Sequence, residues 1–396
     1  MCKETAMFLK EQPVYLGKCE DYTAGEIEAL LRDALATLGF EEKVRGEQVV
    51  IKPNLVRKMA PELGGTTHPV MLDVLIRLLL EMGAQSVLVA ESPGGVYSPG
   101  ALSSVYTGCG IAAVVKQAGG NLNYDCSYGT LSCPDGEKTK NFQVITPILK
   151  ARVAINLCKL KSHGMMMLSA GAKNLFGTIP GVMKFEMHAR FPDSGDFAGM
   201  LADLNAALAR ERSVLTVCDG IVGMEGNGPT GGNPRRMGVV LVSENPFNLD
   251  LAAQQLLSMK EDAPLTAEGI RRGYCPANAQ ELDFPAYRPE QLAVKDFKMP
   301  DTERTSTLQK VLTVHNGRYA RFFEPRPKIG RDCRGCLECV RSCPKKTIEV
   351  VTDKKGRKRA RIVHDGCIKC YCCQELCPFG CVKIEKNPLI SLVSRL

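Results

Sequence analysis

The chain has 396 residues, of which 44% are hydrophobic and 24% are charged, so it is long enough for a main globular domain and a smaller second domain. No stretch supplies the roughly 18 uncharged apolar residues of a membrane span, and the first residues lack an export signal, so we expect a cytoplasmic protein. The net charge of +8 comes without an aromatic-interleaved basic stripe, which argues against nucleic-acid binding.

From Gln48 to about Leu257, short β-branched runs alternate with longer segments of helical periodicity. This alternation predicts an α/β fold with a mainly parallel sheet and flanking helices. The predicted strands are residues 48–55, 86–90, 152–157, 214–217 and 238–242. The predicted helices are residues 67–82, capped by Thr67 and ended by a left-handed Gly83, and residues 197–210.

Polar side chains follow most of these strands, and parallel sheets bind ligands outside the carboxyl ends of their strands. For any single residue, the alternative is that it caps the following helix. If several of these side chains lie close together, they instead indicate a binding site. The candidates are Lys52 with Asn54, Glu91 with Ser92, Lys159 with Lys161 and His163, Asp219, and Glu244 with Asn245.

The segment 159–181 is the richest of these. Lys161 and His163 leave a strand two residues apart and point the same way if the chain stays extended, and Lys173 and Asn174 follow on a predicted helix. A Lys and His pair can hold an anionic group and exchange a proton near neutral pH. The alternative is that His163 only orders its own loop. The methionines at 165–167 are interpreted as core filling.

The segment 219–236 is predicted to be a loop. Gly226, Gly228 and Gly231 match the dinucleotide fingerprint by letter, but Pro229 interrupts them and the next predicted element is a strand near Gly238, so the Rossmann context is missing. The loop could bind an anion through its backbone N–H groups beside two arginines, 235 and 236, or be a plain surface loop.

Ten of the 18 cysteines lie between Cys333 and Cys381. Sliding the sequence by 34 positions superimposes two repeats, each with three cysteines two residues apart, a fourth after three more residues, and then a proline. This spacing is typical of two-cluster ferredoxins, in which the fourth cysteine binds the other cluster, whereas zinc ribbons use two separated pairs. The predicted cofactors are two 4Fe-4S clusters, one held by Cys333, Cys336, Cys339 and Cys377, the other by Cys367, Cys370, Cys373 and Cys343.

Cys372 and Cys381 do not fit the ligand register, so we interpret them as small residues near a cluster. The basic loop 354–361 joins the repeats and is either a solvated hairpin or a docking patch for an acidic redox partner. The predicted domains are an α/β domain at 1–262, a covering segment and linker at 263–326, and a small α+β ferredoxin-like domain at 327–388.

The large domain resembles the family called domain of unknown function 362. The motifs that carry the resemblance are IKPNL (51–55), THP (67–69), KLKSH (159–163), GAKNLFGTIPG (171–181), DGIVGMEGNGP (219–229) and ENPFNLD (244–250). They cover roughly residues 14–260, and members of the family often carry C-terminal ferredoxin repeats. The resemblance implies an α/β fold and iron-sulfur oxidoreduction but no substrate, and Cys372 departs from the usual repeat.

Our main hypothesis is an oxidoreductase that takes low-potential electrons from a soluble redox partner protein and delivers them to a small anionic substrate in the large domain. The residues predicted to bind the substrate or supply protons are Lys161, His163, Lys173, Asn174 and Glu225. The alternatives are an electron carrier whose large domain docks a protein partner, and a maturation factor for another metalloenzyme.

Overall fold

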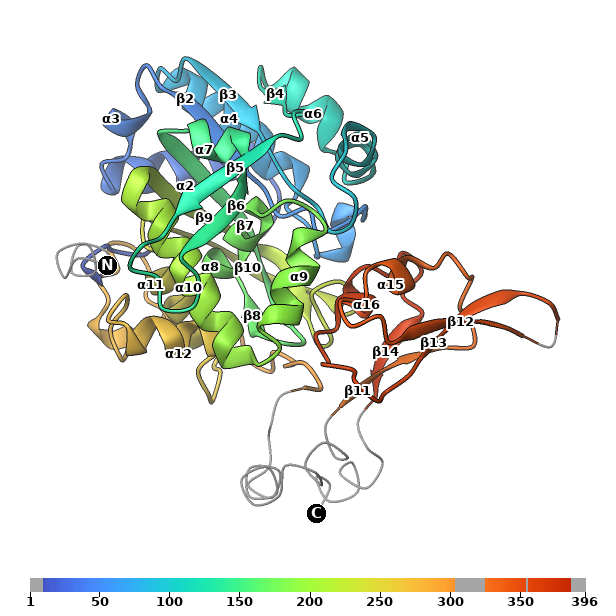
Figure 1. The fold of residues 1–396 in the computed structure, drawn as a ribbon. Coiled ribbons are helices and arrows are strands. Elements are labelled where there is room, and N and C mark those ends of the chain that lie inside the picture. Colours follow the sequence, from blue (N-terminus) through green and yellow to red (C-terminus); the bar gives the residue numbers. More distant parts are fainter. Residues whose placement is uncertain (1–9, 303–324, 354, 386–396) are drawn as a thin grey trace.

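The computed structural model describes residues 10–302, 325–353 and 355–385, which form two bodies side by side (Figure 1). The larger body is built around one sheet with helices on both faces, and the smaller body holds the cysteine repeats. The predicted fold class is therefore confirmed. The parts 1–9, 303–324 and 386–388 of the predicted domains, and Lys354 of the basic loop, lie outside the described residues.

The central sheet is mostly parallel, with strands in the order β1, β10, β9, β7, β2, β3, β4 and with β8 paired to β7. Strands β4, β3, β2, β7 and β9 run parallel, whereas β10 is antiparallel to both β9 and β1. Their bounds are β1 Tyr15–Lys18, β2 Gln48–Lys52, β3 Ser86–Val89, β4 Asn121–Leu122, β7 Val153–His163, β8 Met167–Ser169, β9 Ser213–Glu225 and β10 Asn233–Ser243.

Each face of the sheet has its own core, because successive side chains of a strand point to opposite faces. In β2, Val49 and Ile51 point into a core shared with α2 (Ala24–Thr37), α4 (Pro69–Glu81), α5 (Pro99–Gly108) and α6 (Ile111–Gln117). Val50 points into the opposite core, shared with α8 (Gly171–Asn174), α10 (Ser194–Glu211) and α11 (Pro246–Leu256). Helices and apolar side chains thus cover both faces of the sheet.

Shorter elements complete the large body. They are the helices α3 Glu41–Val44, α7 Thr146–Lys150, α9 Met183–Arg190 and α12 Pro264–Arg271, the 3-10 turns η1 Pro61–Leu63, η2 Leu175–Thr178, η3 Ala279–Glu281 and η4 Pro289–Leu292, and the outer strand pair β5 Tyr128–Ser132 and β6 Asn141–Ile145. None of the helices in the described ranges is long and apolar enough to cross a membrane.

The segment 219–236 is a β-hairpin, not the long loop that the sequence suggested. Strand β9 continues to Glu225 and β10 already begins at Asn233, where the two residues pair. The prediction was wrong because the glycines and prolines of this segment have low strand propensity, and the ladder with the neighbouring strand overrides that propensity. Only the tip, residues 226–232, lies outside the strands.

The start of α4 also differs from the prediction. His68, not Thr67, is the N-cap, and its Nδ1 accepts from the N–H of Val70 (3.3 Å). The Thr67 hydroxyl instead accepts from Asn54 N (2.8 Å) and donates to Leu157 O (3.0 Å), which ties the loop after β2 to β7. Gly83 has a φ of 92° after the helix, as predicted.

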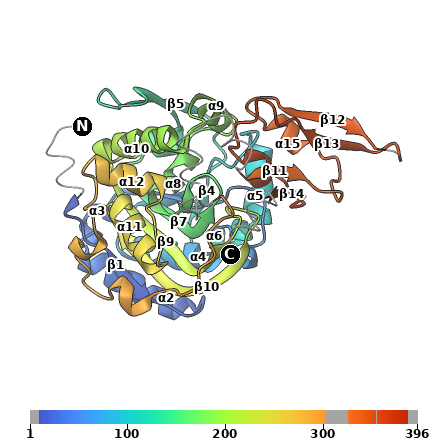
Figure 2. The same cartoon turned by 90° about the horizontal axis from the view of Figure 1, so that it is seen from below.

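The smaller body is nearly two-fold symmetric. Strand β11 (Arg326–Ile329) pairs with β14 (Val382–Glu385), and β12 (Ile348–Thr352) pairs with β13 (Lys358–Ile362). The one-turn helices α15 (Glu338–Arg341) and α16 (Cys372–Glu375) follow left-handed residues at equivalent positions, Leu337 with a φ of 63° and Tyr371 with a φ of 60°. In Figures 1 and 2, the β12–β13 hairpin reaches away from the large body.

Candidate active site

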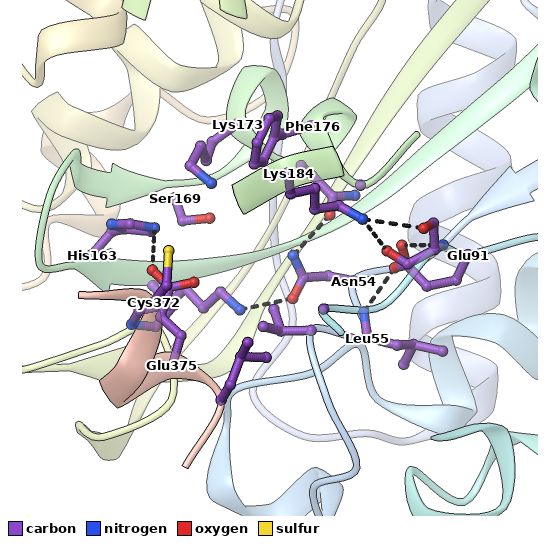
Figure 3. Close-up of a pocket in the computed structure, with 18 of the residues that line it drawn as sticks. Asn54, Leu55, Glu91, His163, Ser169, Lys173, Phe176, Lys184, Cys372 and Glu375 are labelled. Carbon is purple, nitrogen blue, oxygen red and sulfur yellow. Dashed lines mark hydrogen bonds and ion pairs between the residues drawn. The ribbon is translucent and has the colours of Figure 1, made fainter. Parts of the chain in front are cut away.

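A pocket lies at the junction of the two bodies (Figure 3). Its walls come from the carboxyl ends of β2 and β7, the segment after β3, the stretch from α8 to α9, and α16 of the cysteine module. It has about 650 Å³ of empty space, a volume that includes the open solvent at its mouth. The large domain and the cysteine module therefore share one pocket.

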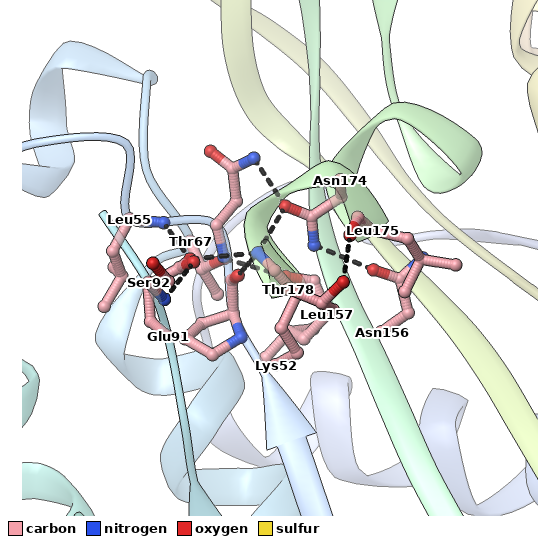
Figure 4. A network of polar contacts seen from close by, with 12 residues as sticks. Lys52, Leu55, Thr67, Glu91, Ser92, Asn156, Leu157, Asn174, Leu175 and Thr178 are labelled. Atoms are coloured by element: carbon pink, nitrogen blue, oxygen red, sulfur yellow. Dashed lines mark hydrogen bonds and ion pairs between the residues drawn. The ribbon is translucent and has the colours of Figure 1, made fainter. Parts of the chain in front are cut away.

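A chain of buried hydrogen bonds forms one side of this pocket (Figure 4). Lys52 Nζ donates to Glu91 Oε2 (2.9 Å) and to Asn174 Oδ1 (3.0 Å). Asn54 Nδ2 donates to the same Asn174 oxygen (2.7 Å), and Lys161 Nζ donates to Asn54 Oδ1 (2.7 Å). Five polar residues that follow strands or lie on α8 thus converge, because the carboxyl ends of parallel strands meet at one edge of the sheet.

Two lysines of the pocket, Lys161 and Lys184, donate only to uncharged groups, so the pocket has an excess of positive charge. The second acceptor of Lys161 is the carbonyl of Gly65 (2.7 Å), and Lys184 Nζ donates to the carbonyl (2.6 Å) and hydroxyl (3.1 Å) of Ser92. No carboxylate neutralises either ammonium within 4 Å among the described residues. Burial lowers the pKa of Lys161 and the pKa of Lys184 to about 7.

Lys173 presents a third ammonium to the pocket. Its Nζ lies 4.9 Å from the ring centre of Phe176 and 5.9 Å from that of Phe197, and within the described part of the chain it makes no hydrogen bond or ion pair. Burial lowers the pKa of Lys173, and the nearby Glu375 opposes that shift. An ammonium group that contacts only aromatic faces keeps its three N–H donors available for an anion.

His163 links the large domain to the cysteine module. Its Nδ1 accepts from the backbone N–H groups of Met165 (3.1 Å) and Met166 (3.3 Å), so a neutral ring carries its proton on Nε2. That nitrogen lies 3.3 Å from Glu375 Oε1 on α16. Burial and the charge of Lys173 lower the pKa of His163 well below its ordinary value, which favours the neutral ring. His163 thus orders its own loop and also contacts the cysteine module.

His188 supplies an unpaired nitrogen to the same pocket. Its ring stacks on Phe197 at 4.4 Å between centroids and meets Phe176 edge-on at 5.6 Å. Burial lowers the pKa of His188 to about 3, and its buried Nδ1 has no hydrogen-bond partner within the described ranges. A buried polar atom without a partner is costly, so this nitrogen is suited to a ligand or a water.

Lys159 and Asp219 form a separate buried network away from the pocket. The ammonium of Lys159 donates to Asp219 Oδ2 (2.7 Å) and to the hydroxyl of Tyr22 (2.7 Å), which in turn donates to Asp219 Oδ1 (2.8 Å). The pairing of β7 with β9 shifts register between Lys159 and Lys161, so the two lysines lie on either side of an irregularity in the strand. The network ties the first residues of the large domain to the sheet.

The structure does not bring Glu225 into the pocket. Its carboxylate accepts from the backbone N–H of Lys298 (3.1 Å) and lies 4.0 Å from Arg235 Nε. Arg235 also donates to the carbonyl of Lys295 (2.9 Å), and Arg236 donates to the carboxylate of Asp21 and to the carbonyl of Glu20 (2.6 Å). The two arginines are thus occupied within the large domain.

Glu244 and Asn245 also lie elsewhere, because β10 runs antiparallel and ends at the opposite edge of the sheet. Glu244 pairs with Lys43 (2.5 Å), and Asn245 caps α11 by accepting from the N–H of Phe247 (2.9 Å). For these two residues, capping and surface pairing are the correct interpretations.

The cysteine module brings several of the predicted ligands close together. A second cavity, with about 350 Å³ of empty space, is lined by Cys343, Cys367, Cys370 and Cys373. In the other set, burial and then the neighbouring thiols Cys377, Cys333 and Cys336 raise the pKa of Cys339 to about 11. Among the described residues, no group of three or more Cys, His, Asp or Glu side chains is arranged so that it could hold a single metal ion. Four thiols around a cavity instead fit a cluster.

Several pocket residues escaped the sequence interpretation. Lys184 and His188 are four residues apart on α9 and face the same way, but nothing in the sequence placed that helix at the site. Cys372, Glu375 and Leu376 reach the pocket from α16. A comparison of the repeats would have pointed to α16, since the first repeat has Glu, Arg and Ser at the equivalent positions.

Comparison with known proteins agrees with this division of the chain. Residues 49–255 match the family described as domain of unknown function (DUF362), and residues 332–381 match a 4Fe-4S dicluster domain. Thylakoid-associated protein sll1697 of Synechocystis sp. is 32% identical over 297 residues, which cover 73% of this chain and 88% of that protein. Uncharacterized ferredoxin MJ0199 of Methanocaldococcus jannaschii is 40% identical over 55 residues, which cover 13% of this chain and 82% of the ferredoxin.

Among solved structures, the lactate racemase apoprotein from Thermoanaerobacterium thermosaccharolyticum aligns with a TM-score of 0.34 and 15% identity, over 52% of this chain and 50% of that one. The match of residues 332–381 to a 4Fe-4S dicluster domain shows that the smaller body is a 4Fe-4S ferredoxin-like domain. This supports iron-sulfur electron transfer.

Proposed function

The chain belongs to the DUF362 family, and we propose that it is an oxidoreductase that reduces a small organic anion in the pocket between its two bodies. The supporting observation is that α16 contributes both to the pocket wall and, through Cys373, to the cysteine cavity. Electrons and substrate would then meet at a distance of a few side chains. We also propose that the domain carries two 4Fe-4S clusters in the two sets of four cysteines.

The charges of the pocket favour an anion. Four lysines, numbers 52, 161, 173 and 184, face only two carboxylates, Glu91 and Glu375, and one of these is paired with Lys52. Buried positive charge without a partner is unfavourable, so an incoming carboxylate would relieve it. Leu55, Phe176 and Leu376 provide apolar wall for the hydrocarbon part of a small organic acid.

The chemistry requires both electrons and protons. A bound 4Fe-4S cluster supplies electrons one at a time at low potential. Reduction of a C=O or C=C bond consumes two electrons, supplied in turn by a soluble redox partner protein, and two protons. Lys161 Nζ exchanges a proton near neutral pH, and His163 Nε2 holds one at the junction with α16.

The test uses anaerobic, photoreduced protein mixed separately with pyruvate, 2-oxoglutarate, fumarate and crotonate. We expect at least one acid to reoxidise the clusters, seen as loss of the electron paramagnetic resonance signal, and to be converted to its reduced product. If the protein stays reduced with every acid yet passes electrons to a second redox protein, it is a carrier and the proposal is wrong.

His163→Ala sharpens this test. The variant should take up photochemical electrons like the native protein but lose conversion of the acid, because Nε2–H is removed from the pocket. Iron content and the reduced resonance signal serve as controls for the cysteine module. Unchanged conversion would exclude His163 from the reaction.

We propose a cytoplasmic location for the reaction, since a soluble donor must reach the module. The Synechocystis relative is named for thylakoids. Cell fractionation followed by immunodetection tests the location, and recovery of the protein with washed membranes would contradict it.

A further inference from the structure

The positive charge of this chain is concentrated in one short segment. Residues 331–361 contain eleven Lys and Arg and only four Asp and Glu, whereas the whole chain has a net charge of +8. The rest of the protein is therefore close to neutral. This segment comprises the first cysteine repeat and the β12–β13 hairpin.

The acidic residues of this segment do not neutralise its surplus. Three of them form ion pairs with arginines: Glu338 with Arg341 (2.5 Å), Asp353 with Arg357 (2.8 Å) and Glu349 with Arg361 (2.7 Å). Five other basic side chains are exposed and have no ion pair or side-chain hydrogen bond within the described part of the chain. They are Arg331, Lys345, Lys346, Lys355 and Lys358. We call these five residues the basic face.

The hairpin part of the basic face borders the first cysteine repeat, whereas Lys345 lines the cavity of the second cysteine set. Gly335, next to Cys336, lies so close to the backbone of Lys358 that a Cβ on it would come within 2.2 Å of the Lys358 carbonyl oxygen. Arg359 donates to the carbonyl of Gly330 (2.6 Å) at the start of the same loop. The hairpin and the loop therefore form one surface, and Cys336 is only half-buried within it.

This surface faces away from the pocket. The pocket is lined by α16 of the second repeat, whereas the hairpin extends away from the large body in both views (Figures 1 and 2). An apolar spot accompanies the charges, since Phe379 is 43% exposed and Arg334 stacks over its ring at 4.7 Å. Aromatic residues and arginine are enriched in protein interfaces.

We propose that the basic face docks an acidic electron-transfer protein, which delivers electrons at the first repeat while the second repeat passes them to the pocket. This inference rests on the proposed function and names the kind of partner that supplies its electrons. Opposite charges steer such a partner toward the half-buried cysteines and raise the association rate by about 10- to 1000-fold at low salt. A lipid surface or a nucleic acid would use the charge without needing the cysteines.

The experiment follows electron transfer from an acidic flavodoxin hydroquinone to the full-length, cluster-loaded protein by stopped flow. Arg331→Glu/Lys358→Glu reverses two charges of the basic face. Lys116→Glu/Lys150→Glu changes the net charge equally on exposed sites of the large domain and is the matched control. We expect the first variant to slow the second-order rate about tenfold at low ionic strength, and we expect the control to react like the native protein.

High salt and a basic acceptor give further readouts. At about 1 M salt the difference between the variants should vanish, because charges are screened beyond about 3 Å. With basic cytochrome c as acceptor, the Arg331→Glu/Lys358→Glu protein should react faster than the native protein. Equal iron content and equal photoreduction by deazaflavin show that the module itself is intact.

Equal rates for both double variants with flavodoxin would overturn the proposal. The same holds if the native protein binds phosphatidylglycerol vesicles through these residues while flavodoxin rates stay unchanged, because the face would then be a membrane site. If no organic acid reoxidises the protein but the flavodoxin rate keeps its charge dependence, the docking face stands and the reductase proposal fails.

Discussion

The two cysteine repeats have the same backbone and different surroundings. Each has a left-handed residue before a one-turn helix, and in each the fourth cysteine sulfur accepts an N–H from four residues later, Thr347 N to Cys343 (3.3 Å) and Cys381 N to Cys377 (3.2 Å). The helix of the first repeat, α15, carries a surface ion pair between Glu338 and Arg341, whereas α16 is inserted against the large domain. The cysteine spacing thus sets the backbone, and the remaining side chains give the two repeats different surroundings.

The contacts of α16 show how the second repeat is specialised. Gln374 donates to the carbonyl of Asn227 (2.7 Å), and the hydroxyl of Thr230 donates to the carbonyl of Glu375 (3.0 Å), so the tip of the β9–β10 hairpin holds this helix. At the position of Gln374, the first repeat has Val340, which could not form this bond. The comparison suggests electron input at the first repeat and delivery at the second.

The largest expected effects come from two single variants, each of which lacks one cysteine ligand of one repeat. Cys336→Ala and Cys370→Ala should each lose about four of eight irons, because each removes a ligand of one proposed cluster. With photoreduced protein, Cys370→Ala should no longer be reoxidised by the organic acid, since the remaining cluster is the one at the basic face. Cys336→Ala should still be reoxidised.

Iron analysis, resonance spectra and product formation measure these effects. If both variants lose reoxidation equally, the repeats do not act in series. If either loses all its iron, the two clusters are not independent, and a milder Cys336→Ser and Cys370→Ser pair repeats the comparison.

The next effect concerns the ammonium that faces α16 across the pocket. Lys173→Met should weaken binding of the reactive acid by about 10- to 100-fold, because a hydrogen bond to a charged group contributes about 1.5–3 kcal/mol. The Met side chain suits the neighbouring Phe176 and Phe197 rings, so folding should be preserved. Lys355→Met, on the basic face, is the control.

Isothermal titration under anaerobic conditions gives the dissociation constants. Unchanged affinity in Lys173→Met would place the anion elsewhere in the pocket. Equal weakening in Lys355→Met would show a general effect of charge instead of a specific contact.

Much of the site could be predicted from the sequence, because parallel strands end at a common edge. Asn54, Lys161 and His163 were predicted from this rule and line the pocket. The rule failed for Glu244 because the direction of β10 depends on the tertiary hairpin with β9. It could not reach Glu375, which lies 3.3 Å from His163 in space but belongs to another domain whose docking leaves no periodic signal in the sequence.

The pH dependence of anion binding provides a third comparison between the pocket and the basic face. The pKa of Lys161 and the pKa of Lys184 are lowered to about 7 by burial, and only the protonated form attracts an anion. Affinity for the acid should therefore be highest below pH 7 and fall up to about tenfold per pH unit above it for each lysine that contacts the anion.

Binding of the acid should also take up protons above pH 7, because the bound anion favours the ammonium form. Titrations in two buffers with different ionisation enthalpies measure this uptake. Flavodoxin docking at the basic face should show no such step between pH 6 and 8, since neither Lys161 nor Lys184 lies on that face. A flat affinity profile for the acid would exclude both buried lysines from binding.

The smallest effect tests how closely α16 fits the large domain. A Cβ on Gly94 would come within 2.5 Å of Leu376 Cδ2, at the wall of the pocket, so Gly94→Ala should push this side chain and loosen the helix. We expect the docking of α16 on the large domain to be weakened by about 1 kcal/mol. This corresponds to roughly fivefold faster alkylation of the buried Cys372 thiol in iron-loaded protein.

Leu376→Ala added to Gly94→Ala should return the alkylation rate toward the native value, because the new methyl group then occupies the space that the leucine leaves. Gly100→Ala, at a site where a Cβ meets no atom within 4 Å, is the control and should leave the alkylation rate of Cys372 unchanged. If the double variant alkylates faster than either single variant, the two substitutions loosen α16 independently, and the new methyl group does not fill the space that the leucine leaves.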